Sequence, residues 1–78
     1  MILVKLFGML RMEYEVSSIE ISNCENVTEI ISKTSELANI PHNVLENCNY
    51  FMNNKLVNHS DCIEPDSEVV VMLPVQGG

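Results

Sequence analysis

The spacing of the apolar residues changes once along this chain, and that change constrains the fold more than any other feature. Between Val27 and Ala38 apolar side chains recur three and four residues apart, the spacing of an amphipathic helix. The members of this stripe are Val27, Ile30, Ile31, Thr34, Leu37 and Ala38. We therefore expect one main helix over roughly Thr28–Ala38, ended by Pro41. One helix can cover only one face of a sheet, so the other face is left to solvent or to a partner.

The remaining apolar stretches are short and rich in β-branched and aromatic residues, which is typical of strands. The expected strands are Ile2–Phe7, Val16–Ser22, Tyr50–Met52, Lys55–Val57 and Glu68–Leu73. With the helix they give the order β-β-α-β-β-β. This order predicts an α+β fold with a mixed sheet of about five strands. We expect the last strand, which is long and apolar, to lie in the middle beside the first.

The connections between these strands carry turn signals. Gly8–Glu13 is expected to be a turn, which makes the first two strands a hairpin. Asn53-Asn54 suits a two-residue hairpin turn, because asparagine tolerates positive φ better than other residues with a side chain. Residues 40–48 are expected to turn at Pro41 and to continue as one helical turn or as a bridging loop.

Charged residues decide which side of a strand faces away from the core. Lys5 places Phe7 on the outer side of the first strand, and Glu68 places Met72 on the outer side of the last. Leu56 is expected on the outer face as well. A cluster of exposed apolar side chains is typical of a contact surface, so Phe7, Leu56 and Met72 form a candidate docking patch.

Composition narrows the class of protein. The chain has 78 residues, which is one domain, and a net charge of −7. That charge argues against binding to nucleic acid or to an anionic membrane and suits a basic partner surface. The three cysteines are an odd number without a Cys-x-x-Cys pair, and the first ten residues lack the features of a signal peptide. We therefore expect a reduced, cytoplasmic protein.

The chain offers few residues for chemistry of its own. Only His59 and Cys62 are close in sequence among the potential metal ligands, and their spacing is not that of a zinc site. Both His42 and His59 are expected at the surface, and no cysteine is paired with a base. A phosphate-binding glycine loop is also absent from the sequence. We expect no metal, no bound cofactor and no catalysis by the chain alone.

The last five residues begin at Pro74 and end in Gly77-Gly78. Two interpretations are open: a frayed end, or a slim strip ending in a carboxylate that can enter another protein's active site. The docking patch lies at the root of this strip, which favours the second interpretation.

Four stretches of the sequence carry a resemblance to a known family. They are Leu3–Arg11, Val27–Ile31, Met52–Asn54 and Glu68–Gly78. The chain resembles the ubiquitin-like sulfur carriers with the β-grasp fold, most closely the small subunits of molybdopterin synthase, and is related to the thiamine-biosynthesis carriers. Leu73 replaces the first of two prolines usual in that family. Asp66-Ser67 replaces a Gly-Asp pair, so Asp66 is expected to adopt a left-handed conformation.

The resemblance implies a β-grasp domain over residues 1–73 and a flexible tail over 74–78. It implies that an activating enzyme of the ubiquitin-activating type uses ATP to adenylate the Gly78 carboxylate, which then becomes a thiocarboxylate. The large subunit of molybdopterin synthase, in a heterotetramer, would supply the catalytic site where this sulfur passes to cyclic pyranopterin monophosphate. Phe7, Leu56 and Met72 match the docking positions, while Pro74, Val75, Gln76 and Gly77 match the tail that threads into the partner.

Other functions stay open beside this one. The chain could carry sulfur for thiamine synthesis or tRNA thiolation. It could be a modifier joined to lysines through Gly78, or a β-grasp binding module in which Gly77-Gly78 is incidental.

Overall fold

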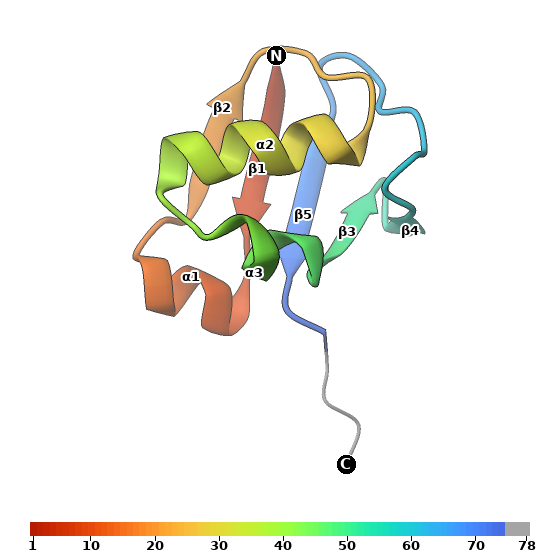
Figure 1. The fold of residues 1–78 in the computed structure, drawn as a ribbon. Coiled ribbons are helices and arrows are strands. Elements are labelled where there is room, and N and C mark those ends of the chain that lie inside the picture. Colours follow the sequence, from red (N-terminus) through yellow and green to blue (C-terminus); the bar gives the residue numbers. More distant parts are fainter. Residues whose placement is uncertain (75–78) are drawn as a thin grey trace.

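The structure is a computed structural model that describes residues 1–74. Its five strands form one mixed sheet in the order β2-β1-β5-β3-β4. The strands are β1 (Ile2–Leu6), β2 (Ser18–Ile21), β3 (Asn49–Met52), β4 (Lys55–Val57) and β5 (Glu68–Met72). Figure 1 shows this sheet behind a helix that crosses it. The prediction that the last strand lies in the middle, beside the first, is confirmed.

The register of β1 and β5 confirms which side chains face the core. The two strands run parallel, with Val4 opposite Val69 and Leu6 opposite Val71. All four of these side chains are buried. The alternate residues, including Lys5, are more exposed and lie on the opposite face.

The main helix α2 (Val27–Ala38) covers one face of the sheet (Figure 1). The Asn26 side chain accepts a hydrogen bond from the backbone N–H of Glu29 over 3.1 Å, so Asn26 is the N-cap. The predicted stripe is buried at four positions, but Leu37 is 59% exposed, so its assignment to the core was wrong. Leu37 lies in the last turn and about 70° from the centre of the four buried positions at 100° per residue, at the margin of the buried face.

The segment after β1 is a helix, α1 (Gly8–Tyr14), and the prediction of a turn and a tight hairpin was wrong. β1 and β2 still pair antiparallel, but α1 joins them. Gly8 enters the helix at φ +62, a conformation that glycine adopts without strain. Leu10 is fully buried and anchors the helix to the core. Tyr14 is partly buried against the same core, so tertiary contacts of two α1 side chains favour the helix over a tight turn.

Residues 40–48 contain one short helix, α3 (His42–Glu46), so the first of the two alternatives is observed. Leu45 is fully buried, and its carbonyl oxygen accepts a hydrogen bond of 2.7 Å from the buried hydroxyl of Tyr50. This bond ties α3 to the start of β3. Both α1 and α3 lie at the end of the sheet where β5 finishes (Figure 1).

The predicted tight turns are confirmed. Asn53 and Asn54 both have positive φ, at 55° and 64°, between the antiparallel strands β3 and β4. Asp66 adopts the left-handed conformation with φ 58°. Among the helices of residues 1–74, none has the length and apolar character needed to cross a membrane.

Candidate functional site

Phe7 and Met72 meet on the face of the sheet that α2 leaves open. Both line a shallow hollow over β3 and β5, and both line a second hollow that reaches Pro74. Phe7 is 49% exposed although it is a large aromatic residue at the end of a core strand. The structure therefore brings together two of the three predicted docking residues, next to the point where β5 ends.

Pro74 is half-buried and contributes to the same hollow as Phe7. The start of the predicted tail therefore lies directly beside two of the predicted docking residues, Phe7 and Met72. The other predicted tail residues, Val75, Gln76, Gly77 and Gly78, lie outside the described residues.

Leu56 lies farther out than predicted, on the edge strand β4. It is 61% exposed and lines neither of the hollows that Phe7 and Met72 share. Cross-strand pairs connect Leu56 to one of these hollows: Leu56 lies opposite Phe51, and Phe51 lies opposite Val70. Phe51 and Val70 line this hollow together with Phe7 and Met72. We use the name apolar patch for these five residues, Phe7, Leu56, Met72, Phe51 and Val70.

Two members of the apolar patch, Phe51 and Val70, were not predicted as docking residues. The run Tyr50–Met52 contains no charged residue that would mark its outer face. The run alone therefore does not show whether Phe51 points toward the core or away from it. A signal existed in the hairpin: a two-residue turn at Asn53-Asn54 places Phe51 opposite Leu56, on the same face. Met9 on α1 extends the surface beside Phe7, and was missed because α1 was expected to be a turn.

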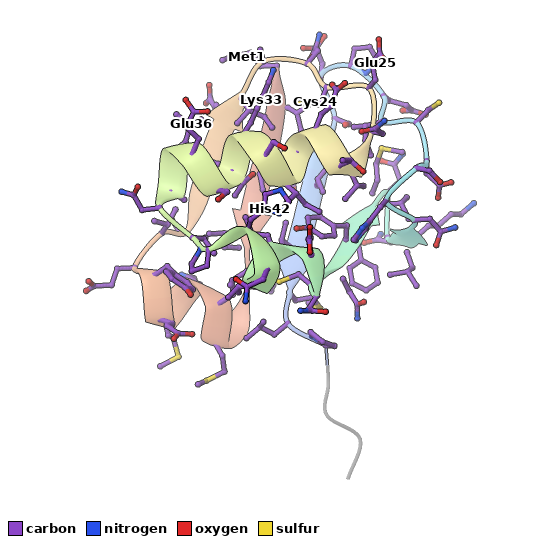
Figure 2. The ribbon with its side chains drawn as sticks, viewed as in Figure 1. Met1, Cys24, Glu25, Lys33, Glu36 and His42 are labelled. Atoms are coloured by element: carbon purple, nitrogen blue, oxygen red, sulfur yellow. The ribbon has the colours of Figure 1, made fainter. Side chains whose placement is uncertain are left out.

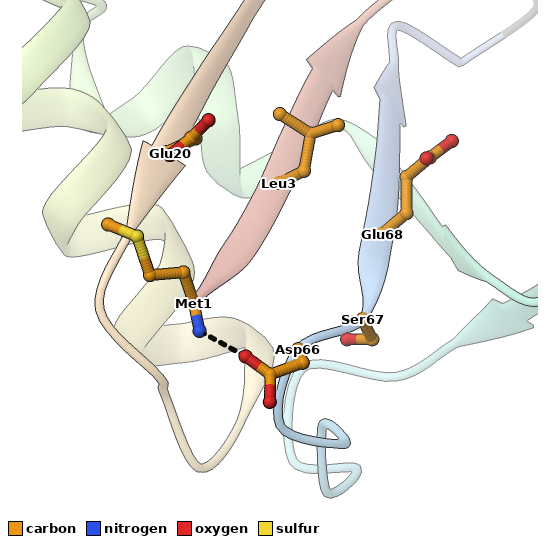
Figure 3. A pocket seen from close by; sticks show the side chains of 6 residues that line it. All are labelled: Met1, Leu3, Glu20, Asp66, Ser67 and Glu68. Atoms are coloured by element: carbon orange, nitrogen blue, oxygen red, sulfur yellow. Dashed lines mark hydrogen bonds and ion pairs between the residues drawn. The ribbon is translucent and has the colours of Figure 1, made fainter.

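The opposite end of the same face is acidic. Figure 3 shows a hollow in which Leu3 lies between the carboxylates of Glu20 and Glu68, with Asp66 at its border. The Asp66 carboxylate forms an ion pair with the ammonium group of Met1. The open face is thus apolar where β5 ends and acidic where β5 begins.

The cysteines and histidines form no reactive centre in the described part of the chain. Cys24 and Cys48 are buried, and burial raises the pKa of both thiols, which keeps them protonated and weakly nucleophilic. His42 and His59 are exposed, as predicted. Within residues 1–74, His, Cys, Asp and Glu side chains do not gather in any group of three that could hold a metal ion.

The geometry therefore places a partly exposed apolar surface beside Pro74, and comparison with known proteins gives the family and the fold. The ThiS family model matches residues 4–78, almost the whole length. The chain belongs to the ThiS family. This ThiS family member has no match among curated proteins.

Solved structures share the fold of this ThiS family member. SAMP1 from Haloferax volcanii is similar with a TM-score of 0.70 and 16% identity, over 99% of this chain and 98% of that one. A putative molybdopterin converting factor, subunit 1, from Pyrococcus furiosus is similar with a TM-score of 0.74 and 20% identity, over 95% and 97%. The chain is thus a ubiquitin-like β-grasp protein of the type found in sulfur carriers and small protein modifiers.

Proposed function

We propose that this chain is the sulfur carrier subunit of molybdopterin synthase, with Gly78 as the reacting residue. The observation that carries the proposal is the position of Phe7 and Met72, which form a partly exposed apolar base beside Pro74 at the root of a Gly-Gly tail. A carrier must hold its tail in a partner's active site, and an apolar base next to the tail gives that partner a surface to grip. Membership of the ThiS family supports the carrier role.

The reacting group in the proposed chemistry is the Gly78 carboxylate. A carboxylate is a poor electrophile, so it must first be activated. An adenylating enzyme of the ubiquitin-activating type joins the Gly78 carboxylate to AMP from ATP and releases pyrophosphate. Sulfur at the oxidation level of sulfide then attacks the acyl carbon, expels AMP and leaves a thiocarboxylate. In the large subunit's active site this sulfur bonds to cyclic pyranopterin monophosphate, and water then cleaves the bond between the sulfur and the Gly78 acyl carbon, which restores the carboxylate. The chain itself binds no cofactor in this scheme.

The tail residues have separate roles in this proposal. Gly77 and Gly78 have no Cβ, so the tail can pass through a narrow channel while its backbone groups are bound. Gln76 and Val75 continue the threaded strand, and Pro74 limits the conformations that must be lost on insertion. We place the complex, a heterotetramer with the large subunit, in the cytoplasm, where the free thiols of the chain stay reduced.

A second candidate is a ubiquitin-like modifier, favoured by the likeness to SAMP1, a protein that another solved structure names small archaeal modifier protein 1. In that case the activated Gly78 forms an isopeptide bond with a lysine amine. A carrier for thiamine synthesis is a third candidate, since the family model is that of ThiS. All three candidates begin with adenylation of the same carboxylate.

The deciding experiment is the intact mass of the chain purified from cells that make the molybdenum cofactor. We expect a fraction in which sulfur replaces one oxygen at Gly78, and this fraction should accumulate when the large subunit is deleted. Removal of Gly78 should abolish sulfur transfer and leave the thermal unfolding of the domain unchanged. Lysine adducts without any thiocarboxylate would favour the modifier, and thiamine dependence of a deletion strain would favour the thiamine pathway.

A further inference from the structure

Leu73 packs against the core although it lies one residue beyond the end of β5. The buried side chains of β5 are Val69 and Val71, so the alternation of the strand continues to Leu73. The core that all three contact fills the space between α2 and the sheet (Figure 2). Leu73 therefore joins the core directly to Pro74, where the predicted tail begins.

Sheet pairing ends before Leu73. The pairing of β5 with β1 extends to Val71, and that with β3 extends to Met72. Outside these strands, no backbone hydrogen bond joins Leu73 to any of residues 1–74. Leu73 instead lines a hollow with Gly8 and Met9, at the point where β1 passes into α1. Packing of the half-buried side chain is therefore what holds Leu73 in place.

Two restraints act on the backbone where the predicted tail begins. Pro74 fixes its own φ at about −65° and limits the preceding residue to extended conformations. Rotation about the N–Cα bond of Leu73, its φ, is left for another restraint. Burial of the Leu73 side chain limits this rotation, because a change in φ would move the side chain away from the core. Leu73 and Pro74 thus restrain different bonds.

We propose that Leu73 is a positioning residue for adenylation of Gly78, and that its burial fixes the direction in which the chain leaves the domain at Pro74. The proposal rests on the proposed function. An enzyme that binds the tail must order every free bond between the folded domain and the reacting carboxylate. To fix the backbone of one residue weakens binding roughly tenfold. A residue that the core already holds avoids this loss.

The test is ATP–pyrophosphate exchange with the purified adenylating enzyme from the same cells, in which KM and kcat for this chain are measured separately. Leu73→Ala removes the packing and should raise KM about tenfold with kcat unchanged. The matched control is Ile19→Ala, which removes the same number of carbon atoms from a half-buried side chain on the same core. Ile19 lies on the edge strand β2, two strands from β5, so KM should change less than about twofold.

A second variant, Leu73→Pro, separates positioning from packing. Its ring restrains φ at this position covalently, so KM should return to within about threefold of the unmodified chain. The packing of the leucine is lost in both variants, and thermal unfolding by circular dichroism measures that loss. An enzyme that contacted the leucine side chain directly would lose this contact in both variants, so KM would then stay raised in Leu73→Pro.

The restraint itself can be measured without the enzyme, by the NMR order parameter of the backbone N–H at position 73. We expect about 0.85 in the unmodified chain, the value of a rigid backbone. In Leu73→Ala the order parameter should fall below about 0.6, the range of a flexible segment.

The outcomes separate this proposal from the proposed function. A flexible N–H at Leu73 in the unmodified chain would overturn the positioning role while the carrier function stands. Equal KM values for Leu73→Ala and Ile19→Ala, or a KM that stays raised in Leu73→Pro, would overturn it as well. Absence of exchange with the unmodified chain would overturn the carrier function, and the positioning role with it.

Discussion

The backbone N–H of Phe7 donates a hydrogen bond to the carbonyl oxygen of Val71 over 3.0 Å. This bond extends the pairing of β1 and β5 one residue beyond the end of β1. It holds Phe7 against β5, the strand that leads to Pro74, so the predicted docking residue and the start of the predicted tail lie on paired segments. We therefore expect a partner that binds Phe7 to contact Pro74 as well, where the proposed tail begins.

The apolar patch should matter for binding much more than for stability. We expect Met72→Asp to weaken adenylation of Gly78 by a factor of roughly 30 in KM, which corresponds to about 2 kcal/mol, the size of an interface hot spot. Its thermal unfolding should stay within a few degrees of the unmodified chain, because Met72 lies on the open face.

The matched control for this variant is Leu37→Asp on α2. Leu37 is also a large exposed apolar residue, 59% exposed, but it lies on the helix side of the sheet. Pyrophosphate exchange should be unaffected by this change. Equal loss from both variants would mean that the apolar patch has no special role.

Thr34 is the one buried polar side chain whose hydroxyl lacks a hydrogen-bond partner within the described residues. Burial of an unpaired hydroxyl is unfavourable, so Thr34→Val should stabilise the domain by about 1 kcal/mol. Urea unfolding monitored by circular dichroism measures this change. Thr28→Val serves as control, since the Thr28 hydroxyl is exposed and donates to the carbonyl of His59 over 3.3 Å. A loss of stability in Thr34→Val would show that its hydroxyl is satisfied by water.

Tyr50 should make the domain less stable at alkaline pH. Burial raises the pKa of the Tyr50 phenol above its ordinary value, and the nearby Cys48 raises it further. The unfolded chain therefore loses this proton above about pH 10 while the folded chain keeps it, so the free energy of unfolding falls as pH rises past that value.

The variant Tyr50→Phe separates this titration from the hydrogen bond. At pH 7 we expect a loss of about 1 kcal/mol, because the carbonyl of Leu45 loses its donor. Above about pH 10 its stability should fall less steeply with pH than that of the unmodified chain. Parallel curves in urea titrations between pH 8 and pH 11, a range set by the ordinary tyrosine pKa of about 10, would contradict this assignment.

The three cysteines should differ in their reaction with iodoacetamide. Cys62 is exposed, whereas Cys24 and Cys48 are buried. Burial raises the pKa of the Cys24 thiol, although the Lys33 ammonium partly opposes this, and burial alone raises the pKa of Cys48. At pH 8, below the ordinary thiol pKa of about 8.5, the native protein should be alkylated at Cys62 first. Mass spectrometry of the labelled peptides measures the order, and rapid labelling of Cys48 would indicate local opening of α3.

Several features of the fold could be predicted because each depends on neighbours in sequence. The alternation around Lys5 and Glu68 correctly placed the core faces of β1 and β5. The turn at Asn53-Asn54 needed only residues that tolerate positive φ.

The helix α1 could not be predicted in the same way. Its seven residues are too few for a clear helical period, and a helix this short depends on tertiary contacts, here those of Leu10 and Tyr14 with the core. The full apolar patch also depends on contacts between segments that are distant in sequence. Phe51 joins it through pairing across three strands, which the run Tyr50–Met52 did not reveal by itself.

By itself, the sequence determined the number and order of the main strands, the central helix, and the Gly77-Gly78 ending with its family resemblance. These follow from local periodicity and from side-chain size. Only the tertiary structure decided that Phe51 and Val70 line one hollow with Phe7 and Met72, and that Glu20 and Glu68 flank Leu3 at the other end. These contacts join segments far apart in the chain, and they form only when strand pairing brings β1 and β5 together at the centre of the sheet.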